Sequence, residues 1–150
     1  MADSKGLTQK ETTLGDAAVD GLLAGGGAGV LMAAYLIVAG LAVGEGLTVI
    51  LGRFDPGGTA SPVVGALTHL AVSGIYGALF GIGWRIVPRG WRGRWTGLGA
   101  GLGYGLALFG VAVALLLPAT TSPLSEIPAL HFAAAHALYG LALGRLMARK

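Results

Sequence analysis

Four long apolar stretches, separated by short polar segments, dominate this chain. They cover residues 21–44, 62–87, 95–117 and 126–147. An α-helix rises about 1.5 Å per residue, so that about 20 apolar residues cross the ~30 Å hydrocarbon core of a bilayer. The pattern therefore predicts an all-α protein, an integral membrane four-helix bundle over residues 21–150. A polar tail over residues 1–20 precedes it, with room for a short surface helix after Thr13.

Local signals mark where these helices begin and end. Ser61 followed by Pro62 is a side-chain cap with proline at the first helical position. Ser125 is expected to cap the fourth helix, with Glu126 near the positive end of its dipole. The charged residue Glu45 allows two possibilities for the end of the first helix. Either this helix continues past Glu45, or a short amphipathic piece follows at the membrane surface.

The composition agrees with a membrane environment. The chain is 54% hydrophobic and 11% charged, with a mean hydropathy of +0.74, whereas a soluble domain carries about 25% charged residues. A net charge of +3 and a pI near 9.6 would suit nucleic acid, but the basic residues are confined to the short segments between apolar stretches. No nucleic-acid partner is expected, and the lipid bilayer is the expected surrounding.

The positions of the basic residues predict an orientation. Nine of the ten lie in the tail, between the second and third apolar stretches, or at the C-terminal end, and Arg53 is the exception. Loops rich in Lys and Arg stay in the cytoplasm. Both termini are therefore predicted to be cytoplasmic, in the plasma membrane of a prokaryote.

The segment after the second helix combines arginine and tryptophan, the residues that anchor helices at lipid headgroups. Trp84 lies just before it, where an interfacial anchor is expected. Binding of a specific anionic lipid or of a partner subunit is the sharper alternative for this segment. The expected headgroup anchors are Arg85, Arg89, Trp91, Arg92, Arg94 and Trp95.

Glycine is unusually abundant, at 28 of 150 residues, and small residues let helices in lipid approach closely. The second and fourth apolar stretches both contain Tyr-Gly-x-x-x-Gly, and superimposing the two motifs places Ser73 opposite His136. Duplication of a helical hairpin and the low complexity of a Gly/Ala/Leu sequence explain this echo equally well. The glycines expected in helix packing are Gly77, Gly81, Gly140 and Gly144.

Polar side chains inside the apolar stretches are the candidates for function, because such groups are costly in a membrane. His69, Ser73 and Tyr76 follow an i, i+4, i+7 spacing and share one helix face. On the fourth helix, His136 and Tyr139 share a face, whereas His131 is rotated from His136 by about 140°. Only one of His131 and His136 is thus expected to meet His69, and His131, nearer the outer surface, is the preferred candidate for a contact with a cofactor or a partner.

These residues leave three interpretations open. The first is that Glu45, Ser73, Tyr76 and Tyr139, with the histidines, make polar contacts that hold the bundle together. The second is axial ligation of a haem or chlorin by His69 with His131 or His136, as in other helical bundles. The third is a path for protons, ions or small solutes that uses Glu45 and the histidines.

An enzyme is not expected. The chain has no cysteine, no pair of carboxylates within an apolar stretch, and no phosphate-binding or zinc-protease motif. The preferred hypothesis is a small non-catalytic subunit or assembly factor of a larger membrane complex, with an energy-transducing complex as one candidate. Its partners would be other membrane subunits or further copies of itself. The alternatives are a haem- or chlorin-binding electron-transfer or pigment module and a small transporter or channel.

Overall fold

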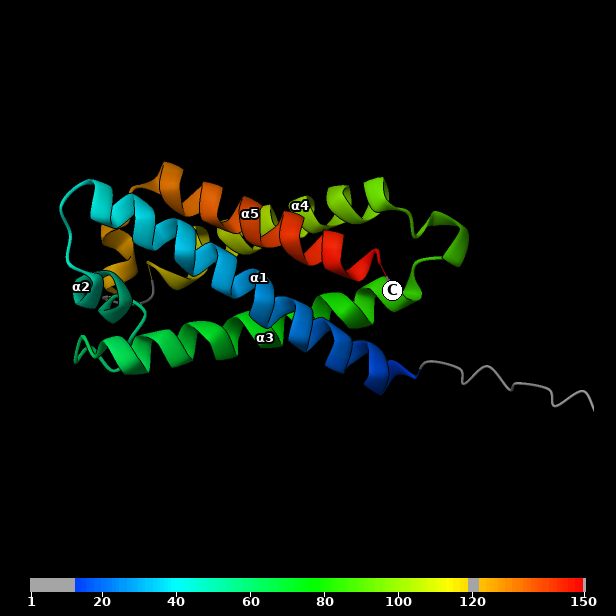
Figure 1. The fold of residues 1–150 in the computed structure, drawn as a ribbon, viewed down its shortest axis with the longest axis horizontal. Coiled ribbons are helices and arrows are strands. Elements are labelled where there is room, and N and C mark those ends of the chain that lie inside the picture. Colours follow the sequence, from blue (N-terminus) through cyan, green and yellow to red (C-terminus); the bar gives the residue numbers. More distant parts are fainter. Residues whose placement is uncertain (1–12, 119–121, 150) are drawn as a thin grey trace, which may run out of the picture.

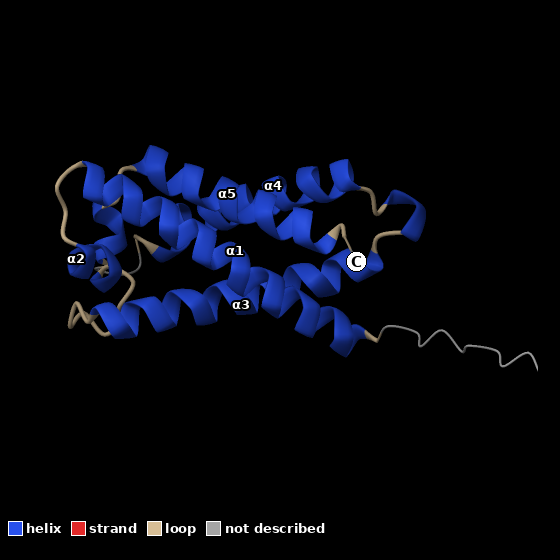
Figure 2. Ribbon diagram, in the orientation of Figure 1, coloured by secondary structure: helices blue, strands red, loops and turns tan. Residues whose placement is uncertain are grey.

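The computed structural model describes residues 13–118 and 122–149, and within these ranges every regular element is a helix (Figures 1 and 2). The long helices run alternately in opposite directions, so that the two ends of the described chain lie at the same end of the molecule (Figure 1). The α-helices are α1 (Leu14–Ala42), α2 (Leu47–Gly52), α3 (Pro62–Ile86), α4 (Arg94–Val111) and α5 (Ala129–Met147). Three short helical segments lie between these helices: η1 (Arg89–Trp91) between α3 and α4, and η2 (Ala112–Leu116) and η3 (Pro123–Glu126) between α4 and α5.

Three of the described helices are long and apolar enough to cross a membrane. They are α1, α3 and the continuous segment formed by α4 and η2. The shorter helix α5 is not among them, because two histidines and Arg145 lower its hydropathy. It is nevertheless well buried, since it lies between α1 and α4.

Helices α1 and α3 meet through glycine, with backbone directly against backbone. A methyl group added at Gly77 would overlap the carbonyl oxygen of Gly21 and lie 2.5 Å from the Cα atom of Gly25. One turn further along α3, Gly81 faces the carbonyl oxygen of Ala17 in the same way. This seam has no room for a side chain on either helix.

Helices α4 and α5 form a second seam of the same kind. Gly140 faces the carbonyl oxygen of Gly101 and lies beside the backbone of Gly105, and Gly144 faces the carbonyl oxygen of Gly97. The second seam matches the first in register, because Gly140 and Gly144 take the places that Gly77 and Gly81 take on α3. The Tyr-Gly-x-x-x-Gly echo in the sequence therefore corresponds to equivalent contacts in two hairpins.

The hairpin of α1 and α3 and the hairpin of α4 and α5 pack against each other mainly between α1 and α5. Ala28 of α1 and Ala135 of α5 are fully buried there, and Met32, Tyr139 and Leu143 fill the space around them. On the opposite side, α3 and α4 do not pack along their length.

The first helix differs from its prediction at both ends. It begins at Leu14 rather than at residue 21, because Thr13 and Asp16 form a reciprocal capping box and Ala17 is already buried. It ends at Ala42, and the short helix α2 follows after Glu45. Of the two possibilities that the sequence left open, the structure excludes a continuous first helix: Glu45 lies outside α1, and a separate short helix follows.

The fourth helix begins later than predicted. Its first residue is Ala129, whereas Ser125 and Glu126 lie in the separate turn η3. Pro128 is the cause, because proline disfavours a helical conformation in the residue before it, and Ile127 is extended at φ −72° and ψ 125°. Ser125 is therefore not the cap of this helix.

The end of α3 corrects one predicted anchor. Trp84 is buried and stacks on Phe80, with ring centroids 6.0 Å apart, so it does not reach the lipid headgroups from this position. Arg92 holds the turn by donating to the carbonyl oxygens of Val87 and Arg85 at 2.7 and 2.6 Å. Trp91 and Trp95 are strongly exposed, as headgroup anchors must be.

The glycine seams predict a sharp difference between two alanine variants on the same helix. Gly77→Ala forces α1 and α3 apart and should lower the free energy of unfolding by ~1–3 kcal/mol. Gly83→Ala points into open space and should leave this free energy unchanged or raise it by up to ~1 kcal/mol, because alanine favours a helix. Unfolding in detergent micelles measures both, and equal effects would contradict the seam.

Candidate functional site

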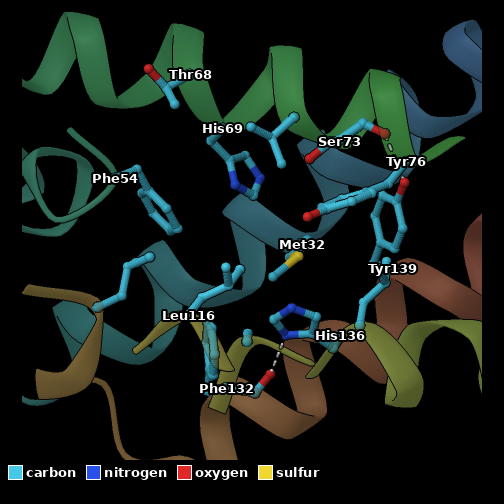
Figure 3. Close-up of a pocket in the computed structure, with 14 residues that line it drawn as sticks. Met32, Phe54, Thr68, His69, Ser73, Tyr76, Leu116, Phe132, His136 and Tyr139 are labelled. Carbon is cyan, nitrogen blue, oxygen red and sulfur yellow. Dashed lines mark hydrogen bonds between the residues drawn. The ribbon is translucent and has the colours of Figure 1, made fainter. Parts of the chain in front are cut away.

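A cavity of about 180 Å³ lies between the two hairpins, on the side where α3 and α4 are apart (Figure 3). Most of its wall is apolar, and its polar groups come from α3 and α5. It contains all but one of the histidines and tyrosines that the sequence singled out inside apolar stretches. The lining residues are Met32, Phe54, Thr68, His69, Val72, Ser73, Tyr76, Leu108, Ala112, Leu116, Leu124, Phe132, His136 and Tyr139.

The two histidines of the cavity each make one hydrogen bond to the backbone. His69 donates from Nε2 to the carbonyl oxygen of Gly29 on α1 at 2.9 Å. His136 donates from Nδ1 to the carbonyl oxygen of Phe132, one turn earlier on α5, also at 2.9 Å. In the neutral ring the other nitrogen is an acceptor. His69 Nδ1 and His136 Nε2 therefore keep a free lone pair with respect to the described residues.

The tyrosines of the cavity have different roles. Tyr139 is buried and donates to the carbonyl oxygen of Ser73 at 2.7 Å, which ties α5 to α3. Tyr76 instead directs its hydroxyl toward the space beside Met32, the same space that the imidazole of His136 faces (Figure 3). Its hydroxyl makes no hydrogen bond to the described residues, although its backbone carbonyl accepts one from Tyr104 at 2.8 Å.

The cavity is closed along the helix axes and open at its side. Phe54 covers one end and packs on His69 at a centroid distance of 4.7 Å. Toward the other end, Tyr104 bridges from α4 to α3. Two lining residues on opposite sides of the gap, Val72 on α3 and Leu116 in η2, are 41% and 49% exposed. The mouth of the cavity therefore lies between these two apolar side chains.

His131 belongs to a different place. Its Nδ1 atom is 2.9 Å from the hydroxyl of Tyr35, and it lines a second cavity of about 150 Å³ near the α1–α2 loop. The predicted rotation between His131 and His136 thus separates them in the structure. The sequence left open which of the two meets His69, and in the structure it is His136 that shares a cavity with His69.

Charged residues gather beside this second cavity, at the end of the molecule opposite the termini. Arg53 binds both carboxylate oxygens of Glu45, at 2.6 and 2.7 Å, and donates from Nε to Glu126 at 3.2 Å. Arg53 thereby links Glu45 in the α1–α2 loop to Glu126 in the turn before α5. Glu45 was predicted to make a polar contact within the membrane, but its partner Arg53 is in the connecting segment.

Asp55 organises the loop between α2 and α3. It is buried and accepts hydrogen bonds from Thr59 Oγ1 at 2.6 Å, Gly57 N at 2.9 Å and Ser61 N at 3.0 Å. These bonds hold the pKa of the Asp55 carboxyl below its usual range. The hydrogen bonds with Arg53 lower the pKa of Glu45 likewise, and those with Glu45 raise the pKa of Arg53. Sequence reasoning missed Asp55, although an acidic residue beside Pro-Gly-Gly is a typical signal for such a turn.

The dimensions of the central cavity do not suit a macrocycle. Sites for drug-sized ligands usually enclose ~300–1,000 Å³, and this cavity holds about 180 Å³. Each of its histidines keeps one ring nitrogen with a free lone pair, so it is the volume, and not the hydrogen bonding of the histidines, that argues against a macrocycle. Among the described residues, no group of three or more His, Cys, Asp or Glu is placed to hold a metal ion. The arrangement suits hydrogen bonding to a small neutral group.

Comparison with known proteins gives no relative for this chain: no family model, no curated protein and no solved structure matches it.

The carboxylates at this end predict a loss of stability in acid. Because the folded pKa values of Glu45 and Asp55 lie below the unfolded ones, their stabilisation is present above about pH 4 and disappears as the pH falls through the folded values. Thermal unfolding in detergent between pH 7 and pH 3 should show the melting temperature falling below pH 4. The double variant Glu45→Gln/Asp55→Asn should melt lower at pH 7 and show a flatter profile. A wild-type melting temperature that rises on acidification would contradict the assignment.

Proposed function

We propose that the protein is a four-span membrane protein that acts as a non-catalytic subunit or assembly factor, associating with other membrane helices through the outer face of α4. The observation that carries this proposal is the unequal use of the two faces of α4. Its buried residues are Gly97, Gly101 and Gly105, all of them against α5. Its opposite face carries glycine too, and there nothing in the described structure contacts it.

The outer glycine face has the geometry of a packing surface. A methyl group added at Gly99, Gly103 or Gly110 would meet no atom within 4 Å. With Leu106, which is 44% exposed, these residues follow a spacing of four, three and four, which places them on one side of a helix. A glycine inside a helix costs about 1 kcal/mol relative to alanine in water. Close approach of another helix is the benefit that offsets this cost in lipid.

The same molecule provides the precedent for this use. Gly77 and Gly140 each lie in a row of small residues, and each row is occupied by a neighbouring helix in backbone contact. The outer face of α4 is the comparable row without a neighbour among the described residues. An additional transmembrane helix, from a partner subunit or a second copy, has the shape that fits it.

The proposed topology places α5 in the membrane with the other three long helices. Because α5 packs between α1 and α4, both apolar enough to cross a bilayer, it shares their depth. Arg85, Arg89, Arg92 and Arg94 lie at the end where the described chain begins and finishes. This end is proposed to be cytoplasmic, with Trp91 and Trp95 as headgroup anchors.

The topology is testable with single cysteines, because the natural chain contains none. Ser125→Cys should react with a membrane-impermeant maleimide added to intact cells, whereas Gly90→Cys should react only after the membrane is opened. Both positions are exposed and lie at opposite ends of the helices. Labelling of Gly90→Cys in intact cells would reverse the orientation, and labelling of both would contradict the single span proposed between them.

The association surface is testable with leucine variants. Gly99→Leu/Gly103→Leu should reduce co-purification of membrane partners, or of a differently tagged second copy, by about tenfold or more, since ~1.4 kcal/mol of lost packing suffices for that factor. Gly26→Leu/Gly83→Leu is the matched control, because these glycines also face open space but on α1 and α3. A wild-type protein that purifies alone and monodisperse from native membranes in gentle detergent would count against the proposal.

A further inference from the structure

The central cavity has features of a binding site that the association role of α4 does not explain. It lies on the α3 side of the molecule, and its mouth is framed by Val72 and Leu116, both exposed apolar residues on membrane-crossing helices. Phe54 covers one end and Tyr104 bridges the helices toward the other. A molecule that enters here comes sideways, from the lipid.

The helix beside the mouth is locally widened. Residues Ala112–Leu116 form a π-turn, in which the amide of Leu117 bonds to the carbonyl oxygen of Ala112 at 2.8 Å. Such turns occur in short pieces and often at functional sites. Here the wider turn carries two lining residues, Ala112 and Leu116, along one side of the mouth.

The cavity has the size of one six-membered ring. A dry engineered cavity of about 150 Å³ accepts benzene in another protein, and the volume here is about 180 Å³. Phe54, Phe132 and Met32 supply an apolar lining for such a ring. A flexible apolar tail on the ring would pass between Val72 and Leu116 and remain in the bilayer.

Two polar atoms face this apolar space from either side of Met32 (Figure 3). His136 donates from Nδ1 to Phe132, which leaves Nε2 as an acceptor, and Tyr76 directs a hydroxyl that has no partner among the described residues toward this space (Figure 3). His136 is 9% exposed and lines the cavity. A hydroxyl group satisfies both atoms at once, because it can donate to His136 Nε2 and accept from Tyr76.

We propose that this cavity binds the hydroxylated ring of a lipid-soluble molecule, a phenol or quinol with an apolar tail, which enters from the bilayer between α3 and η2. The ring hydroxyl donates to His136 Nε2 and accepts from the hydroxyl of Tyr76. The proposal concerns binding, and it stands independently of the partner that covers α4.

The three histidines of the chain make a direct test possible. Protein labelled with ¹⁵N-histidine in lipid nanodiscs is titrated with 4-hexylphenol, and the methyl ether of this phenol serves as the control ligand. The expected result is a saturable shift of the His136 Nε2 signal with the phenol and a much weaker response to the ether, which cannot donate. His131, bonded to Tyr35 outside the cavity, should keep its signal and so report that α1 and α5 remain packed.

Two pairs of variants separate binding from partition into lipid. Tyr76→Phe keeps the ring and should weaken phenol binding about two- to tenfold, the value of one hydrogen bond, whereas Tyr35→Phe removes a hydroxyl outside the cavity and should not. Val72→Phe at the mouth should abolish the saturable shift, whereas Val64→Phe, exposed on the same helix but away from the cavity, should preserve it.

Three results would overturn the proposal. One is an equal response of His136 to the phenol and its ether, which would mean that the cavity recognises only an apolar ring. Another is full binding by Val72→Phe, which would exclude the lateral entrance. The third is the absence of any saturable shift in protein whose His131 signal is intact, which would mean that the cavity holds water or stays empty.

Discussion

Direct contact between helix backbones at glycine determines how the rest of this molecule is arranged. In lipid, apolar side chains gain little by moving from acyl chains to a neighbouring helix, so that close packing has to hold the helices together. Gly77 against Gly21 and Gly25, and Gly140 against Gly101 and Gly105, supply that packing twice in the same register. Each seam fixes the rotation of two helices about their axes. The side chains that point away from a seam are then fixed as well, including Tyr76 and His136.

The central cavity follows from how the two hairpins meet. On the α1–α5 side the contact residues include Ala28 and Ala135, which leave no space between the helices. On the α3–α4 side, Phe80 and Tyr104 meet with ring centroids 5.2 Å apart, and these rings separate the helices. The molecule is thus closed on one side and open on the other, although its hairpins are alike. The polar groups that the hairpins carry, His69 with Tyr76 and His136 with Tyr139, collect beside this opening.

The sequence predicted the helices better than their exact ends and the faces that they turn toward each other. Apolar length and glycine spacing were enough to predict an all-helical chain, and Gly77, Gly81, Gly140 and Gly144 all lie in backbone seams. The start of α5 was misplaced because the proline at 128 outweighed the capping signal of Ser125. Trp84 was taken for an anchor because its position near the end of a helix does not reveal the face it occupies.

The site was predictable only as a set of candidates. Helical spacing separated His131 from His136 correctly, but which of them meets His69 depends on how α5 is rotated by its seam with α4, and no single-helix pattern contains that information. The ion pair of Arg53 with Glu45 and Glu126 joins residues up to 73 positions apart. This pairing depends on the fold of the loop between α1 and α3, which the sequence pattern does not predict.

The central claim is that the paired hairpins leave a cavity open to lipid between α3 and α4, and spin-label accessibility tests it most directly. Labels at position 72 on α3 and position 116 in η2, introduced into the cysteine-free chain in nanodiscs, are exposed to oxygen, which concentrates in lipid, and to a water-soluble nickel chelate. The account predicts strong collision with oxygen and weak collision with the chelate at both positions. Shielding from both reagents would mean that α3 and α4 close upon each other. Access of the chelate would mean that the cavity opens to water. Either result would contradict the account.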